Sequence, residues 1–238
     1  MINKILKKIK RKFSRADSVS DLSIRKYYKD RFNKTLKNWL IYHHREIVFD
    51  KVSWMGVRIL KNPMDLWIYQ EILYKIKPDI IVEIGSANGG STMYLAHLCD
   101  IMNKGKIISI DMNRDNYIAA HERIINFTGD SLLPDIIKEV EKICLNKTVL
   151  VIHDADHSEQ SVYDNLLKYS HLVSLGSYFI VEDGLLDLFS SMEGIGGYSG
   201  PLNATIKFLK EEKNFIIDED CERYLITYNP KGFLKRIR

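Results

Sequence analysis

The chain has 238 residues, of which 45% are hydrophobic and 28% charged, which is enough apolar material to fill the core of one large α/β domain. Its three cysteines lie far apart without metal-ligand spacing, which argues against a disulfide framework and favours a reducing, cytoplasmic setting. No apolar run approaches the roughly 20 residues that span a bilayer. No apolar stretch of signal-peptide length follows the first basic residues.

The net charge of +4 is unevenly distributed: residues 1–45 hold 14 Lys and Arg against 3 Asp and Glu, so the rest of the chain carries −7. Residues 2–13 place apolar side chains at helical spacing and lysines on the remaining surface, which predicts an amphipathic helix. Two interpretations stay open. Residues 1–15 lie on an anionic membrane at its inner face, or they pack on the body or on a second subunit. We therefore expect a basic helical extension over residues 1–49 and one catalytic domain over residues 50–238.

From Pro63 onward, apolar runs of strand length alternate with helical patterns, which predicts a Rossmann-like, doubly wound, mostly parallel sheet. Ligands bind such sheets at the carboxyl ends of the strands. The predicted strands are residues 80–84, 106–111, 124–127, 148–152 and 178–181, and the predicted helices are residues 63–73, 91–102, 117–123, 134–145 and 158–169.

The turn after the first predicted strand reads Glu83-x-Gly85-x-x-x-Gly89-Gly90. It lacks the glycine spacing of a dinucleotide-binding turn. Glu83 suits a cofactor with a positive amino group better than one with phosphates, and the glycines permit close backbone approach. An ordinary strand-to-helix turn is the alternative. The candidate cofactor residues of this turn are Glu83, Gly85, Ser86, Gly89 and Ser91.

Two later loops complete the candidate cofactor site. Asp111 ends the second predicted strand, 26 residues after Gly85, where an acid can accept hydrogen bonds from both ribose hydroxyls. Asp130 and Ser131 follow Gly129 in the loop where we expect an adenine ring. Plain loop roles are the alternative at each position.

Carboxylates follow two neighbouring strands of the predicted sheet. Asp154 follows the run ending at His153, and Glu182-Asp183 follow the strand at residues 178–181. Three carboxylates gathered at one edge repel one another unless they are neutralised, and an all-oxygen ligand set suits Mg²⁺. Capping of the following helices is the alternative. His157, three residues after Asp154, can face the same pocket as a general base.

Several stretches together resemble the cephalosporin hydroxylase / rhamnosyl O-methyltransferase family. The resemblance runs from about residue 50 to the C-terminus, with its motifs in order. The matching stretches are Trp54–Pro63, Tyr69–Glu71, Val82–Ser91, His153–Ser158, Gly176–Asp183 and Asn229–Arg236.

The resemblance implies an O-methyltransferase that depends on S-adenosylmethionine (SAM) and Mg²⁺ and acts on sugars of glycolipids, polysaccharides or natural products. Related macrolide sugar methyltransferases have an Asp-x-x-His motif and a later Glu-Asp pair. By that pattern Asp154, Glu182 and Asp183 bind Mg²⁺ and His157 is the base. Ala155 departs from the serine often found there and leaves the acids intact.

Two other functions remain alternatives. The family name suggests an Fe(II) hydroxylase, whose facial triad would have to use His157, Glu159 and His171. A non-catalytic, membrane-associated binding module is the other. The body has no stripe of basic and aromatic residues, so nucleic acid is not an expected partner. The expected partner is a small-molecule or glycan acceptor, and the acceptor and a homo-oligomeric state are left open.

Overall fold

The computed structural model describes residues 21–189, 197 and 199–238. It divides into two units, Met1–Leu40 and Ile41–Arg238. The helix α2 spans Asp21–Phe32 in the first unit, and the boundary between the units falls within α3 (Leu36–His43). The Thr35 hydroxyl, just before α3, accepts a 3.1 Å hydrogen bond from the backbone N–H of Asn38. The predicted helix at residues 2–13 lies outside the described residues, and the predicted domain boundary at residue 50 stays a prediction.

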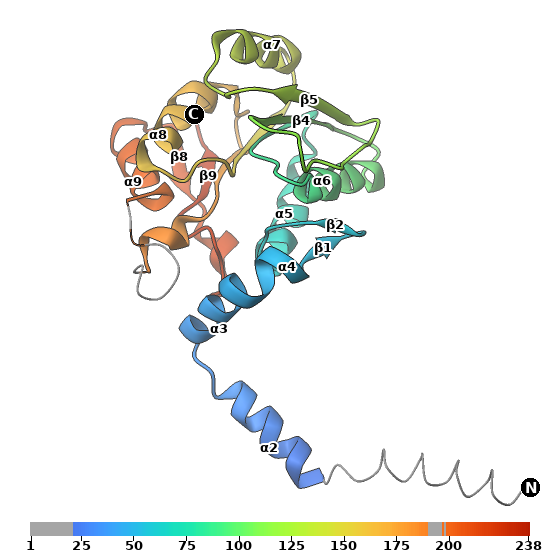
Figure 1. The fold of residues 1–238 in the computed structure, drawn as a ribbon. Helices are drawn as coiled ribbons and strands as arrows, with labels where there is room; N and C mark the ends of the chain where they lie inside the picture. The colour runs from blue at the N-terminus through green and yellow to red at the C-terminus, as the bar shows by residue number, and fades with distance from the viewer. Residues whose placement is uncertain (1–20, 190–196, 198) are drawn as a thin grey trace, which may run out of the picture. The chain divides into compact units, whose positions relative to one another are not determined.

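The second unit alternates strands and helices after a short helical entry and a small hairpin (Figure 1). Its elements are η1 (His44–Val48), α4 (Phe49–Lys51), β1 (Ser53–Trp54), β2 (Val57–Arg58), α5 (Pro63–Ile76), β3 (Ile80–Ile84), α6 (Gly90–Ile101), β4 (Lys106–Asp111), β5 (Ile124–Thr128), α7 (Pro134–Cys144), β6 (Val149–His153), α8 (Glu159–Tyr169), η2 (Ser170–Leu172), β7 (Tyr178–Val181), η3 (Gly184–Asp187), α9 (Pro201–Glu211), β8 (Phe215–Ile217), η5 (Glu219–Glu222) and β9 (Phe233–Arg236).

The central sheet has seven strands in the order β5-β4-β3-β6-β7-β9-β8. The first five run parallel, and β9 is antiparallel to both of its neighbours. Because β3 lies between β4 and β6, the strand order reverses there, and the crevice at such a reversal is where α/β sheets bind ligands. The predicted doubly wound, mostly parallel sheet is confirmed.

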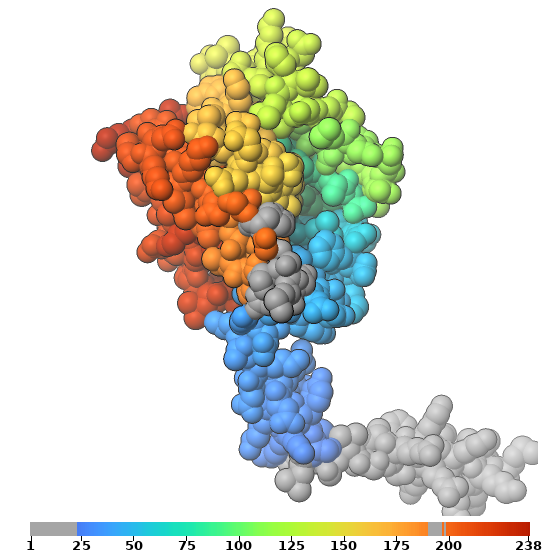
Figure 2. Space-filling model, turned by 60° about the vertical axis from the view of Figure 1, so that its left-hand side comes forward, coloured from blue at the N-terminus to red at the C-terminus, as the bar shows by residue number. Residues whose placement is uncertain are grey.

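Helices cover both faces of this sheet and close one apolar core on each. On one face α5 and α6 pack against the strands through residues such as Ile68 and Leu95. On the other, α7, α8 and α9 contribute residues such as Val140, Leu166 and Phe208. Since β3 and β6 are buried along their whole length, they need continuous apolar sequences, and these are the runs that predicted the strands. In the space-filling view the yellow surface near residue 160 borders the teal and light-blue surface of residues 50–90 (Figure 2).

The turn between β3 and α6 requires its glycines. Gly85 has φ +88°, and a Cβ there would lie 2.0 Å from the carbonyl oxygen of Asp154. A Cβ at Gly90 would lie 2.1 Å from the carbonyl oxygen of Arg58. These close approaches press the turn against the end of β6 and against the β1–β2 hairpin.

The helix predicted over residues 117–123 is wrong: β4 and β5 are joined by a loop. The Asn113 side chain accepts from the backbone N–H of Asp115, which starts a turn. The Arg114 guanidinium stacks over the Tyr117 ring, 4.4 Å from its centroid, and the N–H of Ile118 donates to the Asn88 carbonyl. Tyr117 and Ala119 therefore lie against Gly89 in the turn before α6 instead of forming a helix face, and Ile118 is exposed.

The sequence patterns did not predict β1, β2, β8, β9 or α9. The strand β9 lies between β7 and β8 and completes the sheet. Within the described residues, no helix is both long and apolar enough to cross a membrane.

Candidate functional site

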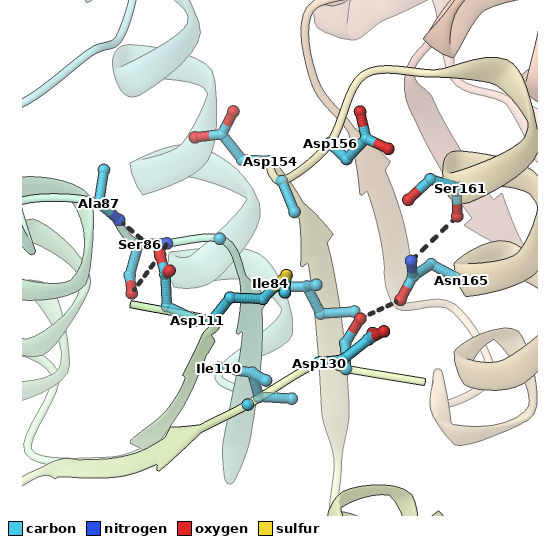
Figure 3. Close-up of a pocket in the computed structure, with 15 residues that line it drawn as sticks. Ile84, Ser86, Ala87, Ile110, Asp111, Asp130, Asp154, Asp156, Ser161 and Asn165 are labelled. Carbon is cyan, nitrogen blue, oxygen red and sulfur yellow. Dashed lines mark hydrogen bonds between the residues drawn. The ribbon is translucent and has the colours of Figure 1, made fainter. Parts of the chain in front are cut away.

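A cavity of about 240 Å³ opens at the carboxyl ends of the parallel strands (Figure 3). Loops after β3, β4, β5 and β6 form its walls, and α8 closes one side. Five of the predicted cofactor residues line it, namely Gly85, Ser86, Asp111, Asp130 and Ser131. The structure therefore brings together three loops that lie far apart in the sequence.

The remaining three predicted cofactor residues do not line this cavity. Glu83 is fully buried behind the turn and accepts a hydrogen bond from the Thr92 hydroxyl; burial raises the pKa of its carboxyl. Gly89 precedes α6 with φ +86°. Ser91 lines a smaller neighbouring cavity of about 20 Å³ that also reaches Asp154.

Asp111 holds the first turn in place from the end of β4. Its carboxylate accepts from the backbone N–H groups of Ser86 at 2.8 Å, Ala87 at 2.9 Å and Asn113 at 3.0 Å. Burial opposes ionisation of this group, but the three backbone donors outweigh it and hold its pKa below the ordinary value. Arg114 braces the same turn by donating to the Ser86 hydroxyl at 2.7 Å.

Ser131 belongs to a buried hydrogen-bond chain that sequence reasoning missed. Its hydroxyl donates to Asn165 Oδ1 at 2.7 Å, and Asn165 Nδ2 donates to the Ser161 carbonyl at 2.9 Å. Asn165 is 2% exposed and lines the cavity (Figure 3). Asp130 is exposed and accepts from the backbone N–H of Leu132.

The predicted acids meet at one edge because β6 and β7 are adjacent and parallel, with His153 opposite Val181. Asp154, His157 and Asp183 each offer a ligand atom, and these atoms all lie within 4.8 Å of one another. His157 Nε2 is 3.3 Å from Asp183 Oδ2. Asp183 itself adopts φ +59°, a backbone conformation that is unfavourable for a non-glycine residue and concentrates at functional sites.

Glu182 reaches the same edge, but two other side chains hold its oxygens. The Tyr69 hydroxyl donates to Oε1 at 2.7 Å, and the Lys61 ammonium lies 2.7 Å from Oε2. Lys61 also forms an ion pair with Asp154. Sequence reasoning assigned no role to Lys61 or Tyr69. We call Lys61, Asp154, Glu182 and Asp183 the charged cluster.

Lys61 and Glu182 are buried and Asp154 and Asp183 are partly buried. The groups of the charged cluster shift one another's pKa values. Burial and the charge of Asp154 raise the pKa of both Glu182 and Asp183. For Lys61 burial favours the neutral amine, but Asp154 and Glu182 outweigh burial and raise its pKa. Burial lowers the pKa of the neighbouring His153 to about 4, and neither of its ring nitrogens has a hydrogen-bond partner within the described residues.

The donor set of the charged cluster fits a hard divalent cation. Two of its carboxylates, those of Asp154 and Asp183, converge with each other and with the neighbouring His157 imidazole, and carboxylate oxygens are the ligands that Mg²⁺ prefers. When its three carboxylates are ionised, one lysine leaves two negative charges, which a divalent cation would balance. The assignment of Asp154, Glu182 and Asp183 as metal ligands stays a prediction.

The structure does not assemble the alternative iron triad. His171 lies on the surface, 3.0 Å from Glu141, and Glu159 accepts from the Ser199 hydroxyl. Among the described residues, the group that can converge on a metal contains His157 but neither Glu159 nor His171.

The strand order, the antiparallel β9 and the cavity at the reversal define the class I methyltransferase fold. Two solved structures of CmcI share it. One, with Mg and SAM, has a TM-score of 0.61 at 22% identity and covers 80% of this chain and 78% of that one. An apo structure has a TM-score of 0.60 at 24% identity, with 79% and 76% covered.

Comparison of the sequence identifies the family. The model of the Rhamnosyl O-methyltransferase/CmcI family matches residues 46–237. A rhamnosyl O-methyltransferase of Mycobacterium leprae is 28% identical over 203 residues, which cover 82% of this chain and 87% of that protein. One from Mycobacterium bovis is 28% identical over 204 residues, 82% of each chain. The chain belongs to this family and is a SAM-dependent O-methyltransferase.

Proposed function

We propose that the protein transfers the methyl group of SAM to a hydroxyl of a sugar, with Mg²⁺ at the charged cluster. One observation carries the proposal: Asp154 belongs both to the wall of the cofactor cavity and to the group of converging ligand atoms. A methyl donor in the cavity and a hydroxyl at the cluster would then be neighbours, and such positioning supplies much of the rate of a transfer reaction.

The cavity residues have distinct roles in this proposal. Asp111 accepts hydrogen bonds from the ribose hydroxyls, while Asp130 and Ser131 flank the adenine. The turn from Gly85 to Gly89 lets the backbone approach the cofactor closely. Glu83 and Ser91, behind and beside that turn, act on the amino-acid end of the cofactor.

Asp154, Glu182 and Asp183 would hold Mg²⁺, and the ion would act as a Lewis acid that lowers the pKa of a bound sugar hydroxyl. His157 takes the proton of that hydroxyl. Its Nδ1 has no hydrogen-bond partner within the described residues, and Asp183 near Nε2 stabilises the imidazolium that forms. A rhamnose unit is the acceptor suggested by the name of the related mycobacterial proteins.

His157→Ala tests the proposal. The variant should bind S-adenosylhomocysteine (SAH) as the wild type does, because His157 does not line the cofactor cavity. Its turnover should fall about a hundredfold to ten-thousandfold, the usual contribution of a general base. Isothermal titration calorimetry measures SAH binding, and release of SAH in the presence of a panel of aryl rhamnosides measures turnover.

His171→Ala is the matched control, since this histidine is exposed and faces Glu141 on the surface. It should keep wild-type turnover. Full activity of His157→Ala would show that another group takes the proton. Wild-type protein that does not bind SAH would contradict the cofactor site itself.

A further inference from the structure

We propose that Lys61 is a resident counter-ion of the charged cluster, which weakens the binding of a divalent cation there and keeps the affinity moderate. This inference rests on the proposed function, because it concerns the site where Mg²⁺ would bind. It assigns a positioning and tuning role to a residue outside the predicted ligand set.

Lys61 is built into the site and is not a surface lysine that happens to bend inward. It is 3% exposed, and its ammonium contacts Asp154 Oδ2 and lies 2.7 Å from Glu182 Oε2. It immediately precedes Asn62, whose side chain caps α5. The same helix carries Tyr69, which donates to the second oxygen of Glu182. The helix α5 and the residue before its N-cap thus deliver both groups that hold Glu182.

The charges of the cluster give Lys61 a definite effect on metal binding. With its three carboxylates ionised, as metal binding requires, the cluster that includes Lys61 carries two net negative charges, so a bound divalent cation brings it to neutrality. Without Lys61 the cluster would carry three net negative charges, and no ammonium group at this position would repel the metal ion. In a partly buried site, removing one opposing unit charge a few ångströms away strengthens cation binding on the order of tenfold or more.

If Lys61 formed a purely structural ion pair, its removal would change the Mg²⁺ affinity in the opposite direction. If Lys61 only held Asp154 and Glu182 in place, its loss would disorder the carboxylates and weaken metal binding. If it is a counter-ion, its loss tightens metal binding while it destabilises the metal-free protein, because buried carboxylates are left without a partner. The direction of the change in Mg²⁺ affinity therefore separates the two roles.

Calorimetric titration of MgCl₂ into the full-length protein tests this inference, with the wild type, Lys61→Met and Lys61→Arg compared at one pH and ionic strength. Lys61→Met removes the charge and should lower the Kd for Mg²⁺ on the order of tenfold. Lys61→Arg keeps the charge and should stay within about twofold of the wild type. The matched control is Lys104→Met, which breaks a partly exposed ion pair with Asp79 at 3.3 Å and should leave the Kd unchanged.

Thermal unfolding in EDTA and in excess Mg²⁺ provides a second readout. Lys61→Met should melt below the wild type in EDTA and gain more than the wild type from Mg²⁺. If Lys61→Met folds in neither condition, Lys61→Gln replaces it in the titration, because glutamine keeps N–H donors for the carboxylates without the charge. The same tightening is expected.

Each result decides one question. A Kd that is unchanged or higher in the neutral variants overturns the counter-ion role while wild-type binding still supports the proposed function. Absence of Mg²⁺ binding in the wild type and in the neutral variants contradicts both. Binding by a neutral variant alone supports the counter-ion role in its strongest form.

Discussion

The hydroxyl of Ser131 lies at the wall of the cavity with its proton directed away from it. Asn165 Oδ1 accepts the hydrogen bond that the hydroxyl donates, and the orientation of the Asn165 amide is fixed because its Nδ2 donates to the Ser161 carbonyl. The Ser131 oxygen therefore keeps its lone pairs for a ligand. An exocyclic amine such as that of adenine is the complementary donor, whereas a carbonyl oxygen at the same place would face another acceptor.

Ser131→Ala should therefore weaken SAH binding by about five- to tenfold, the value of one hydrogen bond. It should also reduce the preference of the protein for SAH over S-inosylhomocysteine, which has a carbonyl oxygen in place of the adenine amine. Calorimetry with both ligands gives the two affinities. Ser174→Ala, at a serine that bonds to β6 away from the cavity, should leave the preference intact. An unchanged preference in Ser131→Ala would place the adenine elsewhere.

Single residues also show how far the sequence could predict the site. Asp154 and the Glu182-Asp183 pair were predictable because each directly follows an apolar strand, and parallel strands end at one edge. Lys61 was not, since a lysine before a helix start normally points to water. Only the tertiary packing of α5 reveals that two carboxylates compensate its burial.

Among the elements, those whose burial is complete were the easiest to predict. The strands β3 and β6 are apolar throughout because both of their faces are covered. A helix was wrongly predicted in the β4–β5 connection because the connection contains apolar residues. They are there for contact with a neighbouring turn, as Ala119 makes at Gly89, and not for packing along one face of a helix. The strand β9 gave no clear signal because its sequence includes Lys235 and Arg236, which suit an antiparallel strand with partial exposure.

The start of α5 is joined to the segment before β9 by a buried carboxylate. Asp65 is 3% exposed and accepts from the Thr227 hydroxyl at 2.6 Å and the backbone N–H of Tyr228 at 2.8 Å. The next residue, Asn229, accepts from the backbone N–H of Asp183 at 3.1 Å. This junction therefore connects the helix that carries Tyr69 to the loop that carries Asp183.

Asp65→Ala should lower the free energy of unfolding by about 2–4 kcal/mol, because the buried backbone N–H of Tyr228 and the partly buried Thr227 hydroxyl lose their acceptor. Chemical denaturation in urea measures this loss. Asp135→Ala is the matched control: Asp135 also follows a proline in the first turn of a helix, α7, but it is exposed, so its loss should cost at most about 1 kcal/mol. Equal losses in the two variants would mean that the junction adds no stability.

At the scale of the whole molecule, the chain separates its charges along its length. Residues 1–45, before the start of the family match at residue 46, carry a net charge of +11, and the remainder of the chain carries −7. The family fold thus carries the cavity and the charged cluster, while the N-terminal segment carries an excess of positive charge. The described part of that segment includes exposed Tyr27, Tyr28 and Phe32 on α2. The amphipathic pattern of residues 2–13 precedes it.

This separation leads to a prediction about membranes, which rests on the sequence of residues 1–15. The full-length chain should co-sediment with vesicles that contain anionic phospholipid and bind neutral vesicles more weakly. A variant lacking residues 1–15 should lose most of this binding, because it lacks seven lysine and arginine residues and the apolar positions between them.

Replacing Lys4, Lys7 and Lys8 by glutamine keeps the apolar positions and should reduce binding mainly to the anionic vesicles. Raising the salt concentration should weaken binding of the full-length chain, because salt screens the electrostatic attraction between its basic side chains and the anionic lipid but leaves the apolar contacts unaffected. Equal sedimentation of the full-length and shortened chains would assign the basic segment to protein contacts instead.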